Sequence, residues 1–149
     1  MVSLGLLVLR VVIGGIFAIH GYPKIFGGPG KGKDVPPEVT NLLGEGFAQS
    51  MDNGGIQNTA NFLQGIDIPY PQMAAIALAA TELGGGLALI LGWQTRLAAL
   101  ALTFSQLVAV EKVHGKQGLV APGGYERNAA LTAATVCLAL AGPGAIALD

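Results

Sequence analysis

The sequence contains four long apolar windows from which charged residues are almost excluded. They cover residues 3–22, 72–92, 95–110 and 128–148. Most of them reach the roughly 20 residues that an α-helix needs to cross a hydrocarbon core of about 30 Å. Strands of a membrane β-barrel would alternate polar and apolar side chains over about ten residues, and these windows do not. They therefore predict an all-α integral membrane four-helix bundle, formed by a single domain over residues 1–149.

The composition excludes the common soluble classes. Hydrophobic residues make up 52% of the chain and charged residues only 11%, whereas soluble domains carry roughly a quarter charged residues. Such a chain is too apolar for intrinsic disorder. Eight Lys and Arg against nine Asp and Glu provide no basic surface for nucleic acid. We therefore expect a lipid bilayer, with partner membrane subunits or further copies of the chain, and no nucleic acid as partner.

Two of the windows differ from the others in length or position. The window 95–110 is short, but Trp93 and Arg96 near its start and Glu111 and Lys112 after it are typical interfacial anchors. The first window has no basic residue before its apolar run and no clear cleavage site. We therefore expect it to be a retained helix rather than a cleaved signal peptide.

The connection between the first two windows divides into two parts. Residues 27–37 are rich in Gly and Pro and predict a flexible turn; they lack the GK[ST] signature of a phosphate-binding loop. Residues 39–66 carry apolar side chains at helical intervals, interrupted by Asn53-Gly54-Gly55. This pattern favours either two short amphipathic helices at the membrane surface or an ordered loop packed on a partner.

The basic residues predict an orientation. If the chain crosses the membrane four times, the connections 23–70 and 111–127 lie on one side and both termini lie on the other. The first side holds most of the Lys and Arg residues, whereas the second holds little beyond Arg96. Because cytoplasmic loops are enriched in Lys and Arg, we expect both connections in the cytoplasm and both termini outside.

Two opposite charges, Arg10 and Glu82, lie well inside the windows. Counted from Tyr22 and Pro71 at about 1.5 Å per residue, both lie roughly 16–18 Å from the same surface. An isolated charge at that depth costs at least about 2.5–3.5 kcal/mol, so we expect the two to pair. Neighbouring glycines would let the two helices approach closely. The pair is either a structural clasp or a site where Glu82 binds a proton or a polar group.

A second polar cluster is expected near the connection side of the membrane. Its members are His20, Lys24, Gln106, His114, Tyr125 and Glu126. Imidazole and carboxylate groups suit a quinone headgroup, because they hydrogen-bond its carbonyls and exchange protons near neutral pH. The alternative is a set of ordinary interfacial and solvated side chains. Haem or metal ligation is disfavoured, since CxxCH, HExxH and paired cysteines are lacking, and Cys137 is expected to be a small core residue.

Seven short motifs then occur in a particular order. They are LRVVIG at 9–14, HGYPKIFG at 20–27, ELGG at 82–85, GWQTR at 92–96, VHGKQG at 113–118, GGYE at 123–126, and GPG with a closing LD at 142–149. In this order they resemble the DoxX family of small membrane proteins over nearly the whole chain. The resemblance implies a four-helix bundle in a bacterial or archaeal inner membrane. It also marks polar positions of the family pattern: Arg10, His20, Lys24, Glu82, His114, Tyr125 and Glu126.

Three functions are open at this point. The first is a membrane subunit of a redox complex that contributes a quinone site through His20, Glu82 and Glu126. The resemblance supports it, because the family takes its name from a subunit associated with thiosulfate:quinone oxidoreduction; enzymatic activity in this chain does not follow. The second is a non-catalytic subunit that stabilises a larger membrane complex. The third is a small-solute or proton-coupled carrier built around the Arg10–Glu82 pair.

Overall fold

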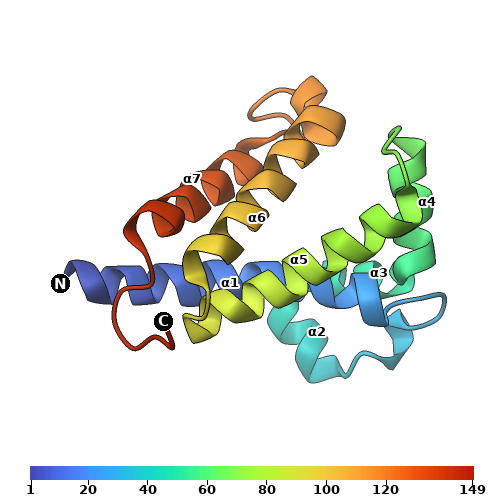
Figure 1. Ribbon diagram of the computed structural model, residues 1–149. Helices are drawn as coiled ribbons and strands as arrows, with labels where there is room; N and C mark the ends of the chain where they lie inside the picture. The colour runs from blue at the N-terminus through green and yellow to red at the C-terminus, as the bar shows by residue number, and fades with distance from the viewer. The chain divides into compact units, whose positions relative to one another are not determined.

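The computed structural model describes residues 1–149 and contains helices but no strands (Figure 1). The elements in chain order are α1 (Val2–Phe26), η1 (Gly32–Asp34), α2 (Pro37–Leu43), α3 (Glu45–Asp52), α4 (Ile56–Gly65), α5 (Pro71–Leu91), α6 (Thr95–Ala109), η2 (Val110–His114), η3 (Gly115–Gln117) and α7 (Glu126–Ala141). Of these, η2 is a π-helix, and η1 and η3 are 3₁₀ helices. The residues group into two compact units. Unit 1 comprises Met1–Ala18 and Gly84–Asp149, and unit 2 comprises Ile19–Leu83.

Three helical segments are long and apolar enough to cross a membrane: Val2–Phe26, Pro71–Leu91 and Thr95–Gln117. They confirm the first three expected helices as candidate spans. The last helix, Glu126–Ala141, has 16 residues, or about 24 Å at 1.5 Å per residue, which is shorter than a hydrocarbon core of about 30 Å. The structure therefore shows three candidate spans, and the window 128–148 is helical only in its first part.

The end of α7 has a clear local cause. Gly142 adopts φ 90°, a left-handed conformation that favours glycine and closes helices, and its N–H donates to Leu138 O at 2.9 Å. Pro143 follows and cannot continue a helix. Residues 142–149 therefore leave the helix instead of extending it, contrary to the expectation from their apolar composition.

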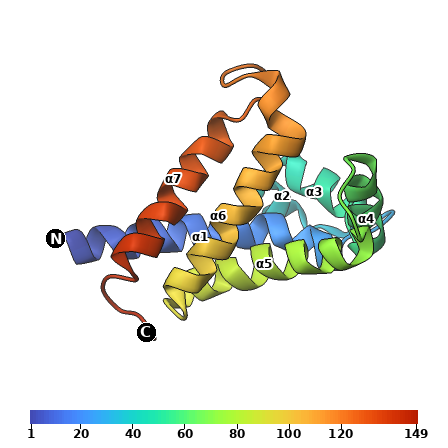
Figure 2. The same cartoon turned by 45° about the horizontal axis from the view of Figure 1, so that its top comes forward.

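Unit 1 is built on helix pairs. Helices α6 and α7 lie side by side and antiparallel, as Figures 1 and 2 both show. A Cβ on Gly14 of α1 would lie 2.5 Å from Gly86 O of α5, so these two backbones are in direct contact. This confirms the expected close approach at glycines. The core of the unit consists of Ile13, Phe17, Ala88, Leu89, Ala98, Ala99, Leu102, Leu131 and Leu138.

Unit 2 holds the connection between the first two spans. The segment 39–66 forms parts of three short helices, where two were expected, because Gly44 adopts φ 94° and separates α2 from α3. The expected break at Asn53–Gly55 is confirmed and separates α3 from α4. Helix α4 packs on α5 through a small core of Ala60, Leu63 and Ala75.

The Gly- and Pro-rich segment after α1 is packed rather than flexible, so that expectation was wrong. The Gly32 N–H donates to Asp52 Oδ1 at 2.7 Å, and the Gly28 N–H donates to Met51 O at 2.7 Å. Gly32 is buried, and a Cβ there would lie 2.5 Å from Ala48 O. The glycines thus allow close packing of this segment against α3.

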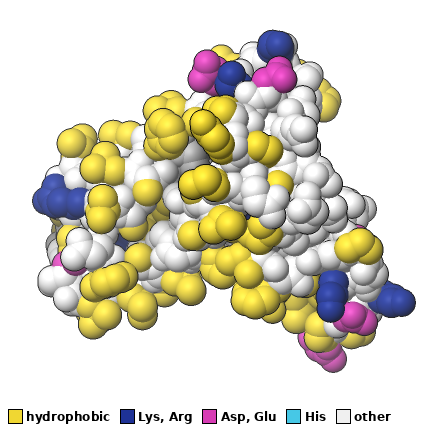
Figure 3. All heavy atoms as spheres, turned by 45° about the vertical axis from the view of Figure 1, so that its right-hand side comes forward, with side chains coloured by type: hydrophobic (Ala, Val, Ile, Leu, Met, Phe, Trp, Pro, Cys, Tyr) yellow, Lys and Arg dark blue, Asp and Glu magenta, His cyan; other side chains and the backbone are white.

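Large apolar side chains cover much of the exterior. On α6 they recur at helical spacing along one side, as Leu97, Leu100, Phe104 and Leu107. Figure 3 shows a face on which hydrophobic and uncharged atoms dominate, while Lys, Arg, Asp and Glu gather in a few small groups. Apolar surfaces of this extent are rare on soluble monomers and are typical of contact with lipid.

Candidate functional site

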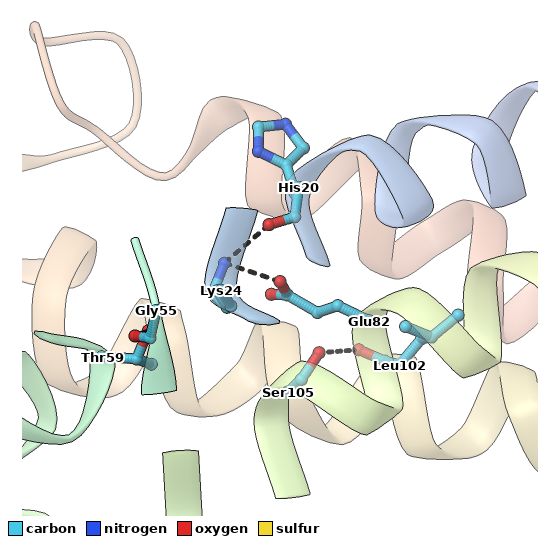
Figure 4. A network of polar contacts seen from close by, with 7 residues as sticks. All are labelled: His20, Lys24, Gly55, Thr59, Glu82, Leu102 and Ser105. Carbon is cyan, nitrogen blue, oxygen red and sulfur yellow. Dashed lines mark hydrogen bonds and ion pairs between the residues drawn. The ribbon is translucent and has the colours of Figure 1, made fainter. Parts of the chain in front are cut away.

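The charged pair of unit 2 is formed by Lys24 and Glu82. Lys24 Nζ lies 2.7 Å from Glu82 Oε2 and also donates to the main-chain oxygen of His20 at 3.1 Å (Figure 4). The Lys24 and Glu82 side chains are 26% and 10% exposed, so the pair is largely removed from solvent. The approach to Glu82 Oε2 lacks the directionality of a hydrogen bond, and this buried oxygen has no hydrogen-bond partner. The contact is therefore an ion pair with unused acceptor capacity.

Local structure explains why these two side chains meet. Helix α1 continues through Pro23 to Phe26, so Lys24 is still helical. On the same helix, a Cβ at Gly21 would collide with the main chain at Glu82 and Leu83 of α5. The missing side chain at Gly21 lets α5 come close enough for Lys24 to reach the carboxylate.

His20 lies one helical turn before Lys24 on α1, and its side chain is exposed. In Figure 4 its carbonyl faces Lys24, whereas its imidazole points away from the Lys24–Glu82 pair. The structure therefore brings His20, Lys24 and Glu82 together within unit 2, with the imidazole on the outer side.

Arg10 belongs to unit 1 and is 1% exposed. Its guanidinium donates to three main-chain oxygens that follow α7, those of Pro143 at 3.2 Å, Ala145 at 3.0 Å and Ile146. Its Nε has no hydrogen-bond partner. Arg10 thus holds the segment after α7 against α1.

The expected pairing of Arg10 with Glu82 was wrong, because each side chain has other partners in its own unit. The error lies in the register. Counting from Tyr22 and Pro71 would place Gly14 opposite Ala79, but Gly14 contacts Gly86, about two helical turns further along α5. Arg10 accordingly lies beside Gly92, where a Cβ would collide with its guanidinium.

Asp149 was not expected to have a role. Its carboxylate accepts the N–H of Gln94 at 2.8 Å and the N–H of Thr95 at 3.0 Å. These are the first N–H groups of α6, which has no cap from its own side chains. The hydrogen bonds from Thr95 and Gln94 and the charge of Arg10 hold the pKa of Asp149 below its usual value, although partial burial opposes them. A helix cap from a residue this distant in the sequence leaves no local motif from which it could be predicted.

A buried amide pair joins α6 and α7. Asn128 Nδ2 donates to Gln106 Oε1 at 2.9 Å, and both side chains are buried. Asn128 Oδ1 has no partner. Deeper along the same helices, the Thr103 and Thr135 hydroxyls are 2.7 Å apart. Gln106 was an expected site residue, whereas Asn128 was missed although it opens the apolar window at 128.

The remaining expected residues lie in the turn between α6 and α7. His114, the last residue of η2, places Nδ1 2.7 Å from Gly123 O. Tyr125 is half-buried, and its N–H donates to Gly118 O at 3.1 Å. Glu126 is exposed in the first turn of α7, where a negative charge is favourable.

The expected second cluster is divided between the units. His20 and Lys24 belong to unit 2, and Gln106, His114, Tyr125 and Glu126 belong to unit 1. No group of three or more His, Cys, Asp or Glu side chains is placed to hold a metal ion. Within the units, Lys24 pairs with Glu82, and Gln106 accepts a hydrogen bond from Asn128.

Cys137 is exposed, so its expected place in the core was wrong. The buried side of α7 is a stripe formed by Asn128, Leu131, Thr135 and Leu138. Cys137 falls two residues after Thr135 and therefore points to another side of the helix.

Comparison with known proteins identifies a family match and a related membrane protein. The family model named DoxX matches residues 5–115. Inner membrane protein YphA of Escherichia coli (strain K12) is 26% identical over 150 residues, which covers 97% of this chain and 87% of that protein. No solved structure matches. With its apolar helices and this family match, the chain is a multi-pass membrane protein that belongs to the DoxX family.

Proposed function

We propose that the chain is an integral membrane subunit of a membrane-associated redox complex, and that Lys24 and Glu82 contribute a binding site for a quinone headgroup. The observation that carries the proposal is a largely desolvated Lys–Glu pair on two helices long and apolar enough to span a membrane. Ionisable side chains inside membrane spans are costly and usually mark pairs, substrate pathways or proton pathways. A role in proton or substrate handling follows naturally from this position.

The two side chains suit a quinone. A lysine ammonium has three N–H donors; Lys24 directs one to His20 O, and its contact with Glu82 is an ion pair without hydrogen-bond directionality. The ammonium therefore has donor capacity left for a quinone carbonyl oxygen. Glu82 Oε2 lacks a hydrogen-bond donor and is free to accept a quinol hydroxyl. A bound quinone would supply two-electron, two-proton chemistry at this place.

Each residue then has a separate task. The Lys24 ammonium orients a carbonyl oxygen and stabilises negative charge that develops on it. Glu82 Oε2 holds a proton that moves to or from the headgroup. The His20 imidazole, which points away from the pair, exchanges protons with the aqueous side, because histidine does so near neutral pH.

Binding of decylubiquinone to the purified full chain in lipid nanodiscs, measured by titration calorimetry, tests this proposal. Lys24→Met is expected to weaken binding about tenfold, since it removes a charge-assisted hydrogen bond. Lys31→Met changes an exposed lysine of the same unit and is expected to bind like the wild type. Absence of binding by the wild type, or equal binding by Lys24→Met, would contradict the proposal and leave the pair as a structural clasp.

The membrane arrangement is also a proposal. We propose that α7 completes a four-helix bundle in a bacterial inner membrane, with residues 23–70 and 111–127 in the cytoplasm and both termini outside. The antiparallel pairing of α6 with α7, the positions of the basic residues and the name of the YphA relative support it.

Cysteine labelling tests the orientation. In a Cys137→Ser background, single cysteines at Trp93, Gln57 and Gln117 would be treated with a membrane-impermeant maleimide on intact cells. We expect Trp93→Cys to react, and Gln57→Cys and Gln117→Cys to react only after the membrane is opened. The opposite pattern would overturn the orientation, and labelling of Trp93 and Gln117 from the same side would overturn the spanning of α6.

A further inference from the structure

We propose that the turn between α6 and α7 is a lipid-headgroup element. In this proposal Leu119 and Val120 insert at the boundary between headgroups and acyl chains, and Lys112 and Lys116 bind anionic headgroups. The juxtaposition that carries it is an exposed apolar tip on an ordered turn with lysines at its base. It requires membrane spanning by α6 and does not depend on a redox function.

Helix length places the turn at the membrane surface. The helical segment Thr95–Gln117 has 23 residues, about 34 Å at 1.5 Å per residue, so it is long enough to cross a hydrocarbon core of about 30 Å and to end among the headgroups. Helix α7 has 16 residues, about 24 Å, and a helix this short draws its flanking residues toward the interface. The residues between Gln117 and α7, which include Leu119 and Val120, therefore lie at the membrane surface in this proposal.

The turn has a defined conformation. It projects beyond the ends of α6 and α7 in both ribbon views (Figures 1 and 2). Tyr125 N–H donates to Gly118 O at 3.1 Å, and His114 Nδ1 lies 2.7 Å from Gly123 O. A pre-ordered turn can present its tip to a partner surface with little further loss of conformational entropy.

The tip is apolar. Leu119 is 47% exposed and Val120 is 75% exposed. Ala121 and Pro122 continue the apolar run, and both are exposed. Burial of such side chains in the acyl boundary is favourable, since it removes apolar surface from water.

The charge of the turn matches an anionic leaflet. Residues 112–125 contain two lysines, one histidine and no acidic residue; Glu111 and Glu126 lie just outside. Both lysines are exposed. The longer connection, 27–70, contains five acidic residues and two lysines. Anionic lipid attracts basic segments next to a span, so of the two connections it is the α6–α7 turn that anionic headgroups favour.

Fluorescence quenching by brominated lipids tests the proposal on the full chain reconstituted in vesicles. Trp93 is the single tryptophan, so Trp93→Phe provides a dark background for Leu119→Trp, with Val120→Trp as a second probe if the first does not fold. Brominated phosphatidylglycerol and brominated phosphatidylcholine are compared. Phe104→Trp, on the exposed apolar side of α6, is the matched control in the hydrocarbon region.

We expect quenching at 119 or 120, with phosphatidylglycerol favoured about fivefold over phosphatidylcholine, and a preference near one after Lys112→Gln with Lys116→Gln. Phe104→Trp should be quenched without lipid preference. Absence of quenching at the turn while Phe104→Trp is quenched would place the tip in water or under a partner protein and overturn the proposal. Equal quenching by both lipids, or a preference that survives removal of the lysines, would overturn it as well.

Discussion

Lys24 and Glu82 form a salt bridge, with Nζ and Oε2 2.7 Å apart, and Gly21 is the position that makes this contact possible. Because a Cβ at Gly21 would meet main-chain atoms of α5, the helices cannot yield by a simple side-chain rotation. The charged pair and the glycine contact are therefore parts of one arrangement in unit 2.

Gly21→Ala is expected to destabilise the protein by about 1–3 kcal/mol, since the added methyl group forces the two backbones apart. Gly15→Ala is the matched control on the same helix, because a Cβ there meets nothing within 4 Å. It should be neutral or slightly stabilising, as alanine favours helix. Thermal unfolding in detergent micelles, followed by circular dichroism, measures both. Equal stability of the two variants would contradict the close contact at Gly21.

Removal of one partner of the ion pair should have unequal effects. Lys24→Met leaves the buried Glu82 carboxylate unpaired and is expected to cost about 3 kcal/mol of unfolding free energy. Glu82→Gln should cost less, because the partly exposed Lys24 can turn its ammonium to water.

The double variant Lys24→Met with Glu82→Gln completes this comparison. It is expected to be more stable than Lys24→Met alone, since no buried charge is left without a partner. Unfolding free energies of the three variants, measured by denaturant titration in mixed micelles, give the coupling. Additive effects of the two single changes would contradict a direct interaction.

Much of the fold follows from hydropathy alone. The apolar windows predicted α1, α5 and α6 because lipid-facing and core-facing side chains are both apolar in a membrane helix. Because both sides of such a helix are apolar, hydropathy alone does not indicate which side is buried in the protein. On α7 the buried stripe is set by Asn128, Leu131, Thr135 and Leu138, and its helical spacing would have identified Asn128 and excluded Cys137 from the core.

The site was harder to predict because it depends on the offset between helices. Residues counted equally far from the ends of two helices lie at equal depth only if the two ends are at the same depth. Here the contact of Gly14 with Gly86 sets the register, so Glu82 meets Lys24 and Arg10 turns to the chain after α7. Backbone contacts between glycines leave no periodic signal in one sequence from which this offset could be read.

The amide pair between α6 and α7 should stabilise their association. Asn128→Leu leaves Gln106 Oε1 buried without its donor, and we expect a loss of about 1 kcal/mol, in the range of hydrogen bonds between membrane helices. The double variant Gln106→Leu with Asn128→Leu should lose less than the sum of the single changes. Ala133→Leu, at an exposed position of α7, serves as the size control. Strict additivity in the cycle would contradict the hydrogen bond.

The cap that Asp149 gives to α6 should make stability depend on pH. The pKa of Asp149 in the folded protein lies below its ordinary value of 3.8, chiefly because Thr95 N–H donates to the carboxylate. The folded state therefore prefers the ionised form, and the stabilisation is fully present above about pH 4. It is lost as the pH falls through the lower, folded-state pKa.

Asp149→Asn should remove this part of the pH dependence and lower stability at neutral pH. Thermal unfolding between pH 2.5 and pH 7, with Asp67→Asn as a control for net charge, measures the difference. A wild type and an Asp149→Asn variant with parallel pH profiles would show that Asp149 does not cap α6.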